Sequence, residues 1–180
     1  MYVLLVLQIK TFSMLISTMV DQEYTLEEIS YSRKEDRRIM ESVLKSWFTD
    51  PKTLNFVSPE FKYPFDFIKW TKLYYKDDIS KITTIVLKHS DWIVGHVSIQ
   101  VEEKNSKIFH LFLNQEHRGK GLAIKMLNEI EDYGKESGTK SIQASIQKKN
   151  LICLKLFTRS GYEYRSLENS KSTIVIKNLR

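Results

Sequence analysis

The sequence predicts an α/β protein built on one mixed sheet with helices on both faces. Segments with strand-like alternation recur along the chain, and amphipathic helical segments separate them. Between Ile108 and about Gly138 a strand, a tight glycine turn and a helix follow one another. The 180 residues are 42% hydrophobic and 28% charged, which suits one domain. We divide the chain into a hydrophobic extension or arm at 1–22 and a single domain at 23–180.

The domain is expected to begin with a strand at residues 24–30 and a helix. Ser32 and Glu35 have the spacing of a capping box, which predicts that the helix starts there. Asp50-Pro51 is expected to end it. Its apolar side would carry Ile39, Val43, Leu44 and Trp47.

A second helical region is predicted after Ser58-Pro59, which is a typical helix start. It runs through an aromatic-rich segment to Tyr75. These aromatic side chains either line a ligand pocket or form core, and burial in the core is expected for most of them because of their large apolar area. They are Tyr63, Phe65, Phe67, Trp70, Tyr74 and Tyr75.

The second half of the chain contains most of the predicted sheet. Strands are expected at 81–88 and 92–102, with Val97, Ile99 and Val101 on one face, and then at 108–113 and 141–146. Alternation places His110 on the face of Ile108 and Phe112. A helix from Leu122 to about Gly138 has an apolar stripe, and 162–167 with 172–177 form a closing hairpin.

The most informative stretch is Arg118 to Ile124, where a basic glycine turn joins the strand to that helix. Glycines at 119 and 121 let the backbone turn sharply, and the first amides of a helix have no partner inside it. Such amides bind anions, above all phosphate. Lys120 would add a point charge, and Arg118 would either grip a phosphate or pack outward. The simpler interpretation is a turn that only reverses the chain.

Here the chain resembles the GNAT superfamily of acetyl-CoA-dependent N-acetyltransferases. Arg118, Gly121 and Ala123 match the family's pyrophosphate signature of Arg or Gln, two residues, Gly, one residue, and Gly or Ala. About thirty residues later, Asn150 to Tyr162 resembles the family's segment of Asn, short helix and Gly-aromatic pair. The resemblance extends from about Tyr24 to Arg180. It implies a central, mostly antiparallel sheet of six or seven strands.

The resemblance also implies a cofactor, acetyl-CoA as cosubstrate, and residues that bind it. Amides near Gly121 would hold the pyrophosphate, and the strand ending at Leu113 would offer its backbone to the pantetheine arm, with the Leu113 N–H stabilising the oxyanion. Asn150 would contact the cofactor arm or serve only as a helix cap. The implied cofactor-binding residues are Leu111, Phe112, Leu113, Arg118, Gly119, Lys120, Gly121, Leu122, Ala123, Asn150 and Phe157.

Proton transfer is where the sequence departs from the family. Many relatives have a tyrosine that protonates the leaving thiolate, and the matching residue here is Phe157. Tyr162 or Tyr164 would substitute, although core burial suits Tyr162. His110 is the candidate base, and His96 with Glu102 or Glu103 competes with it.

The expected function is transfer of an acetyl group to a primary amine of a small molecule or of a peptide or protein N-terminus. Two alternatives remain: a domain of this fold that binds CoA without catalysis, and a basic-patch binding module using Arg118, Lys120, Lys148 and Lys149. The net charge of +6 favours anionic ligands, but interspersed acidic residues argue against nucleic acid. The single cysteine predicts a reducing, cytoplasmic location, and no metal is expected.

The first twenty residues are hydrophobic but interrupted by Gln8, Lys10, Thr11 and Ser13, so stable membrane insertion is not expected. Three interpretations stay open. The true start codon is at Met14 or Met19 and the residues before it are not part of the protein, or the segment is an added strand or arm, or it makes a peripheral membrane contact. The sequence leaves the choice between a monomer and a homodimer open.

Overall fold

The computed structural model describes residues 24–76, 79–165 and 170–179, so the predicted extension at 1–22 lies outside the described residues. Its centre is a seven-stranded sheet in the order β1-β2-β3-β4-β5-β7-β6. Neighbouring strands are antiparallel except β4 and β5, which confirms a mixed, mostly antiparallel sheet. The strands are β1 (Tyr24–Ile29), β2 (Ile82–His89), β3 (Trp92–Gln100), β4 (Asn105–Leu113), β5 (Ser141–Gln147), β6 (Glu163–Arg165) and β7 (Ser172–Asn178).

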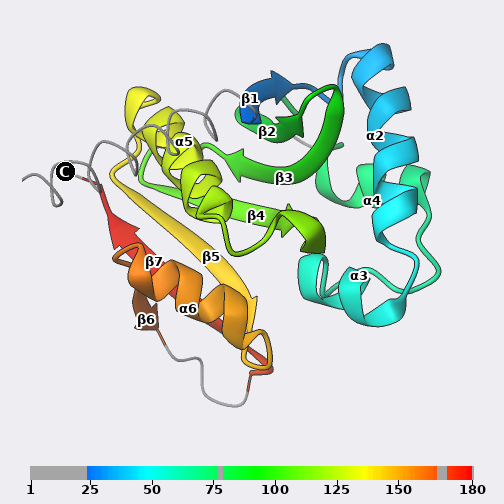
Figure 1. The fold of residues 1–180 in the computed structure, drawn as a ribbon. Helices are drawn as coiled ribbons and strands as arrows, with labels where there is room; N and C mark the ends of the chain where they lie inside the picture. The colour runs from blue at the N-terminus through cyan, green and yellow to red at the C-terminus, as the bar shows by residue number, and fades with distance from the viewer. Residues whose placement is uncertain (1–23, 77–78, 166–169, 180) are drawn as a thin grey trace, which may run out of the picture.

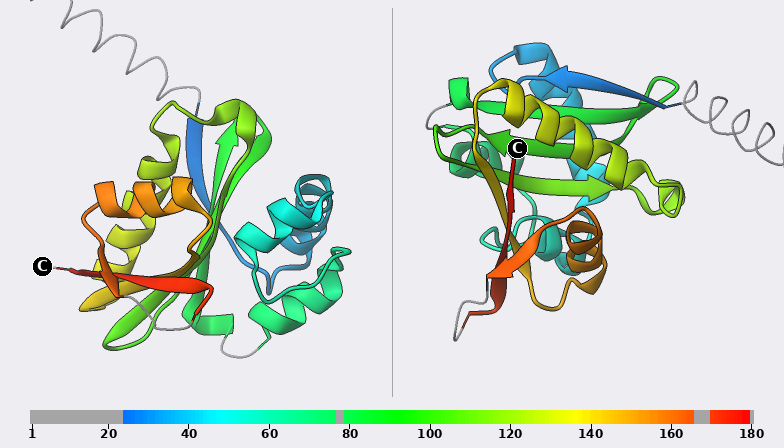
Figure 2. Two further views of the ribbon diagram at one scale, coloured as in Figure 1. Left: turned by 90° about the horizontal axis from the view of Figure 1, so that it is seen from below. Right: turned by 90° about the vertical axis from the view of Figure 1, so that its left-hand side faces the viewer.

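Helices cover both faces of this sheet, as expected (Figures 1 and 2). One face carries α2 (Lys34–Trp47), α3 (Pro51–Val57) and α4 (Phe67–Tyr74); the other carries α5 (Leu122–Glu136) and α6 (Leu151–Arg159). Each layer has its own core because a sheet with two covered faces must bury apolar side chains on both. Met126, Leu127 and Ile130 of α5 fill one core, and Met40 of α2 with Trp70 of α4 fills the other.

The predicted start of α2 is wrong. The helix begins at Lys34, and its N-cap, Arg33, makes no side-chain cap hydrogen bond. The Ser32 hydroxyl instead contacts that of Ser30, and the Asp36 carboxylate accepts from the Ser30 amide at 2.7 Å. The predicted apolar side is confirmed for Leu44, which is buried, and for Val43 and Trp47, which pack against the same core; Ile39 is 45% exposed, and Met40 is buried in its place.

The predicted helix start at Ser58-Pro59 is wrong as well. Ser58 is the C-cap of α3, and its hydroxyl accepts from the Trp70 indole at 2.9 Å. The real starts are Asp50, whose carboxylate accepts from the amides of the first turn of α3, and Asp66, which caps α4 in the same way. The interpretation of the aromatic segment as core is confirmed for Phe67, Trp70 and Tyr75, which are buried.

The second half matches the sequence prediction more closely. The helix after the glycine turn, α5, ends at Glu136, and the predicted hairpin is formed by β6 and β7. Val97 and Ile99 of β3 are both fully buried against α5, in the same core as Val101. Strand β4 begins at Asn105, earlier than expected.

Candidate functional site

The parallel strands β4 and β5 pair over only part of their length. Their register runs from Asn105 opposite Ser141 to Ile108 opposite Ala144. Beyond this point β4 stays with β3 up to Leu113, while β5 stays with β7. Figure 1 shows the two strands diverging toward the end of β4. The facing edges of residues 109–113 and 145–147 therefore have no strand between them in the described part of the chain.

A β-bulge lies where this divergence begins. Ser98 pairs with Phe109 and His96 with Phe112, so His110 and Leu111 together oppose Val97. His110 takes the left-handed conformation, with φ 55°, which is uncommon outside glycine. The bulge corrects the predicted alternation, because His110 shares a face with Phe109 and Phe112, whereas Ile108 lies in the opposite core. His110 thus faces the layer of α4.

The end of β4 directs main-chain groups toward the divergence. The Asn114 amide donates to the Val94 carbonyl at 2.8 Å, so Asn114 faces β3. Because consecutive residues of an antiparallel ladder face opposite sides, the main chain of Leu113 faces away from β3. The Leu113 carbonyl accepts from Arg118 Nε at 2.8 Å, as this geometry requires. The Leu113 N–H points to the same side.

The glycine turn between β4 and α5 forms an exposed loop with free amides. Gly119 and Gly121 have φ of 80° and 77°, and a Cβ added at either would meet nothing within 4 Å. Gly121 is the N-cap of α5, and because glycine has no side chain it cannot cap the first amides of the helix. Within the described residues, no hydrogen bond uses the amides of Gly119, Gly121, Leu122 or Ala123. Free amides at a helix N-terminus with open space above them fit a phosphate.

The two basic residues of the loop are held differently. Arg118 folds back toward β4, where its Nε binds the Leu113 carbonyl and its guanidinium carbon lies 5.9 Å from the centre of the Phe112 ring. Lys120 Nζ donates to the Tyr24 hydroxyl at 3.1 Å, and that hydroxyl is 2.9 Å from His117 Nδ1. Tyr24, at the start of β1, therefore holds the loop in place through its contacts with Lys120 and His117. Sequence reasoning missed it because it lies 96 residues from Lys120.

The second predicted segment forms α6 beneath β5. Asn150 is the N-cap, and its side-chain oxygen accepts from the Cys153 amide at 3.3 Å. Phe157 is 1% exposed, and its ring lies 4.8 Å from that of Tyr162 in the core beside α5. The Tyr162 hydroxyl is buried near Glu131, and burial with this carboxylate raises its pKa. Tyr164 is half exposed and bonds Thr158.

Both histidines of the sheet centre are buried and neutral near pH 7. Burial lowers the pKa of His96 to about 4 and that of His110 well below its ordinary value. His96 Nδ1 lies 3.0 Å from the His110 carbonyl, so it carries the proton and donates across the bulge. His110 stacks on Trp70 at 4.6 Å, its Nδ1 is 3.1 Å from the Tyr75 hydroxyl, and its Nε2 has no partner among the described residues.

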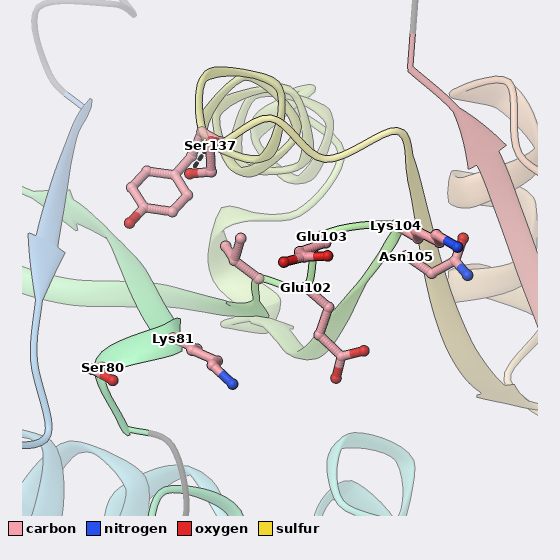
Figure 3. Close-up of a pocket in the computed structure, with 9 residues that line it drawn as sticks. Ser80, Lys81, Glu102, Glu103, Lys104, Asn105 and Ser137 are labelled. Atoms are coloured by element: carbon pink, nitrogen blue, oxygen red, sulfur yellow. Dashed lines mark hydrogen bonds between the residues drawn. The ribbon is translucent and has the colours of Figure 1, made fainter.

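The predicted acidic companions of His96 lie elsewhere. Glu102 and Glu103 follow the end of β3, about 20 Å along the strand from His96. They line a hollow of about 700 Å³ with Lys81, Lys104 and Ser137 at the far end of α5 from the glycine loop. Figure 3 shows Lys81, Glu102 and Glu103 around this hollow, below the end of α5. The structure therefore does not bring these carboxylates to the histidines.

The site thus consists of two parallel strands that diverge, a β-bulge and a glycine loop with exposed amides. A model of the acetyltransferase (GNAT) family matches residues 41–162. The chain belongs to this family. The matched range contains the bulge, the glycine loop and α6. No curated protein sequence matches the chain.

Solved GNAT structures share the fold. The GNAT domain of S. lividans PAT is 14% identical, with a TM-score of 0.71 over 86% of this chain and 89% of its own. The PaiA N-acetyltransferase from Thermoplasma acidophilum, solved with coenzyme A, is 13% identical, with a TM-score of 0.66 over 87% and 99%. The spermidine N-acetyltransferase from Vibrio cholerae, solved with CoA and spermine, is 16% identical, with a TM-score of 0.66 over 87% and 96%. None of the helices in the described ranges has the length and apolarity to span a membrane.

Proposed function

We propose that this GNAT protein is an N-acetyltransferase that moves an acetyl group from acetyl-CoA to a primary amine of a small molecule or of a peptide or protein N-terminus. The observation that carries the proposal is the glycine loop, where the amides of Gly119, Gly121, Leu122 and Ala123 have no partner in the described part of the chain and the glycine positions are open, so that they fit a diphosphate. Coenzyme A is also the ligand named for two of the similar structures.

The thioester would lie along the edge of β4 that β5 leaves unpaired. With the pyrophosphate at Gly121, the pantetheine arm runs beside Leu111, Phe112 and Leu113 and pairs with the strand as an added strand would. The amine nitrogen attacks the thioester carbonyl carbon, the carbon–sulfur bond breaks, and the thiolate leaves. The Leu113 N–H, which faces this edge, would stabilise the negative charge on the carbonyl oxygen.

The reaction also requires proton transfer at two points: the attacking amine loses a proton, and the leaving thiolate takes one up. The proton released from the amine goes to water or to His110, which is neutral at pH 7 and whose Nε2 has no partner among the described residues; this atom has a free lone pair in the tautomer that carries its hydrogen on Nδ1. That atom is enclosed by Trp70 and Tyr74, so it serves only if these rings move. Thiols are acidic, with a pKa of about 8.5 for cysteine, so the thiolate leaves without an acid at Phe157. Tyr162 is the proposed alternative donor.

A binding protein without catalysis is the second candidate. It is favoured by Phe157, which has no proton to donate, and by the burial of Tyr162, 2% exposed, beside it. Both candidates predict binding of acetyl-CoA, and only the first predicts a product.

The test is release of free thiol from acetyl-CoA in the presence of amino acids, polyamines, aminoglycosides or ribosomal N-terminal peptides. We expect thiol and an acetylated amine with at least one of these classes. Gly121→Asp should abolish the reaction by placing a carboxylate in the phosphate site. Gly138→Asp is the matched control, because Gly138 has a similar φ of 82° and open space at the other end of α5. Binding without thiol release from any amine would favour the second candidate.

A further inference from the structure

A buried hydrogen-bonded chain connects the β1–α2 connection to the bulge of β4. The Tyr31 hydroxyl is 3.0 Å from His96 Nε2, and His96 Nδ1 is 3.0 Å from the His110 carbonyl. Tyr31, His96 and His110 are 4%, 1% and 4% exposed, so water does not substitute for these bonds. Each bond therefore matters to the position of the next group.

The direction of each bond in this chain is determined by its last acceptor. A carbonyl oxygen only accepts, so His96 Nδ1 carries the hydrogen. His96 is neutral, so its Nε2 has a lone pair and accepts from the Tyr31 hydroxyl. Without that hydroxyl the buried lone pair on Nε2 has no partner, which is unfavourable and removes one of the two bonds that hold the imidazole. Tyr31 thereby holds the ring in the position from which Nδ1 donates to the His110 carbonyl.

The bonded carbonyl belongs to the strained residue of the bulge. His110 has φ 55°, a conformation that is unfavourable in a residue other than glycine and persists where its surroundings enforce it. Its imidazole is held independently, by stacking on Trp70 at 4.6 Å and by the Tyr75 hydroxyl at 3.1 Å. Both its main chain and its side chain are therefore fixed from the α2–α4 side of the sheet.

The bulge sets the direction of the residues that follow it. His110 is the second residue beyond the last β4–β5 pair, at Ile108, and Leu113 lies three residues further on the same strand. A change in the bulge would rotate the main chain between them, since a bulge determines which way the following residues face. The orientation of the Leu113 N–H thus depends on the hydrogen bond from His96 Nδ1 to the His110 carbonyl.

We propose that Tyr31 and His96 are positioning residues for acyl transfer, which hold the β4 bulge at His110 and so orient the Leu113 amide toward the thioester carbonyl. This inference rests on the proposed function. Neither side chain contacts substrate; both act by aligning the main chain of β4, which does contact it.

The test is infrared spectroscopy of acetyl-CoA labelled with ¹³C at the carbonyl, which needs no knowledge of the amine. In the unaltered protein, a hydrogen bond to the carbonyl should shift its stretching band to lower frequency on binding. Tyr31→Phe keeps the ring and removes the donor, so the shift should shrink while the dissociation constant for acetyl-CoA stays within about twofold, because the phosphate loop is untouched. With a reactive amine, kcat should fall about 10- to 100-fold with little change in KM.

Two substitutions of His96 separate an effect on the orientation of the Leu113 N–H from an effect on overall stability. His96→Asn can retain a donor near the place of Nδ1, whereas His96→Gln places its amide near Nε2 and loses the bond to the His110 carbonyl. The Asn variant should therefore keep more of the band shift and of kcat than the Gln variant. Ser106→Ala is the control: this buried serine at the other end of β4 bonds Thr139 at 2.6 Å, and its loss should lower stability without changing the band.

The outcomes distinguish this inference from the function on which it rests. If the unaltered protein does not bind acetyl-CoA, the proposed function fails and this inference fails with it. If acetyl-CoA binds and is turned over but Tyr31→Phe and His96→Gln leave the band and kcat unchanged, the positioning role alone is overturned. Equal behaviour of the Asn and Gln variants, or a band change in Ser106→Ala as large as theirs, would also overturn it.

Discussion

Mild acid should destabilise the fold through His96. Its pKa in the folded protein is about 4, whereas an unfolded chain has the ordinary value of about 6.5. Below pH 6.5 the unfolded chain therefore takes up a proton that the folded protein does not. The unfolded state gains protons as the pH falls, so the free energy of unfolding must decrease, and the decrease continues down to about pH 4.

The size of the effect follows from the same values. A difference of about 2.5 pKa units corresponds to about 3 kcal/mol in total, of which about 2 kcal/mol should be lost between pH 7 and pH 5. His110 adds to the loss in the same direction, because burial, His96 and Lys107 lower its pKa as well. Ordinary carboxyl groups titrate mostly below this window, at about pH 4.

The assay is urea unfolding followed by tryptophan fluorescence at pH 7, 6 and 5. Trp70 is a suitable probe because it is fully buried against His110. His96→Asn, which cannot titrate, should lose about 2 kcal/mol less between pH 7 and pH 5 than the unaltered protein. A free energy of unfolding that stays constant or rises toward pH 5, or an equal loss in His96→Asn, would refute the reasoning.

Three further predictions concern the core and α6. Gly95→Ala should cost about 1–3 kcal/mol of unfolding free energy in urea, because the new Cβ would lie 2.8 Å from Met126 Sδ; an unchanged midpoint would show that Met126 moves aside freely. Asn150→Ala should cost about 1 kcal/mol by removing the cap of α6, and calorimetry with acetyl-CoA then shows whether affinity falls too; no loss of stability would contradict the capping role. Cys153 should react with a thiol reagent at pH 8 only after unfolding, because burial raises its pKa to about 12, and rapid reaction of the folded protein would contradict this.

The sequence predicted most where a local pattern had one physical solution. The strand, glycine turn and helix around Gly121 were predictable because the positive φ at 119 and 121 suits glycine and the helix stripe is regular. The region of α2 to α4 was harder, because Ser32, Asp50, Ser58 and Asp66 all resemble caps. Tertiary contacts decided among them: Ser58 ended as the partner of the Trp70 indole, while Asp50 and Asp66 cap helices.

The bulge and its support could not be predicted from local patterns. Alternation along β4 gives no sign that one extra residue stands opposite Val97, since the bulge depends on how β3 pairs with β4. The bond from Tyr31 to His96 joins residues 65 positions apart, and that from Tyr24 to His117 joins residues 93 apart. Periodicity within a short window carries no information about contacts at such separations.

The most direct measurement is titration calorimetry of acetyl-CoA into the unaltered protein, Gly121→Asp and Gly138→Asp. If the amides between Gly119 and Ala123 bind the diphosphate, the unaltered protein and Gly138→Asp should bind with similar affinity, and Gly121→Asp should show no detectable heat of binding. No binding to the unaltered protein, or undiminished binding to Gly121→Asp, would contradict the account.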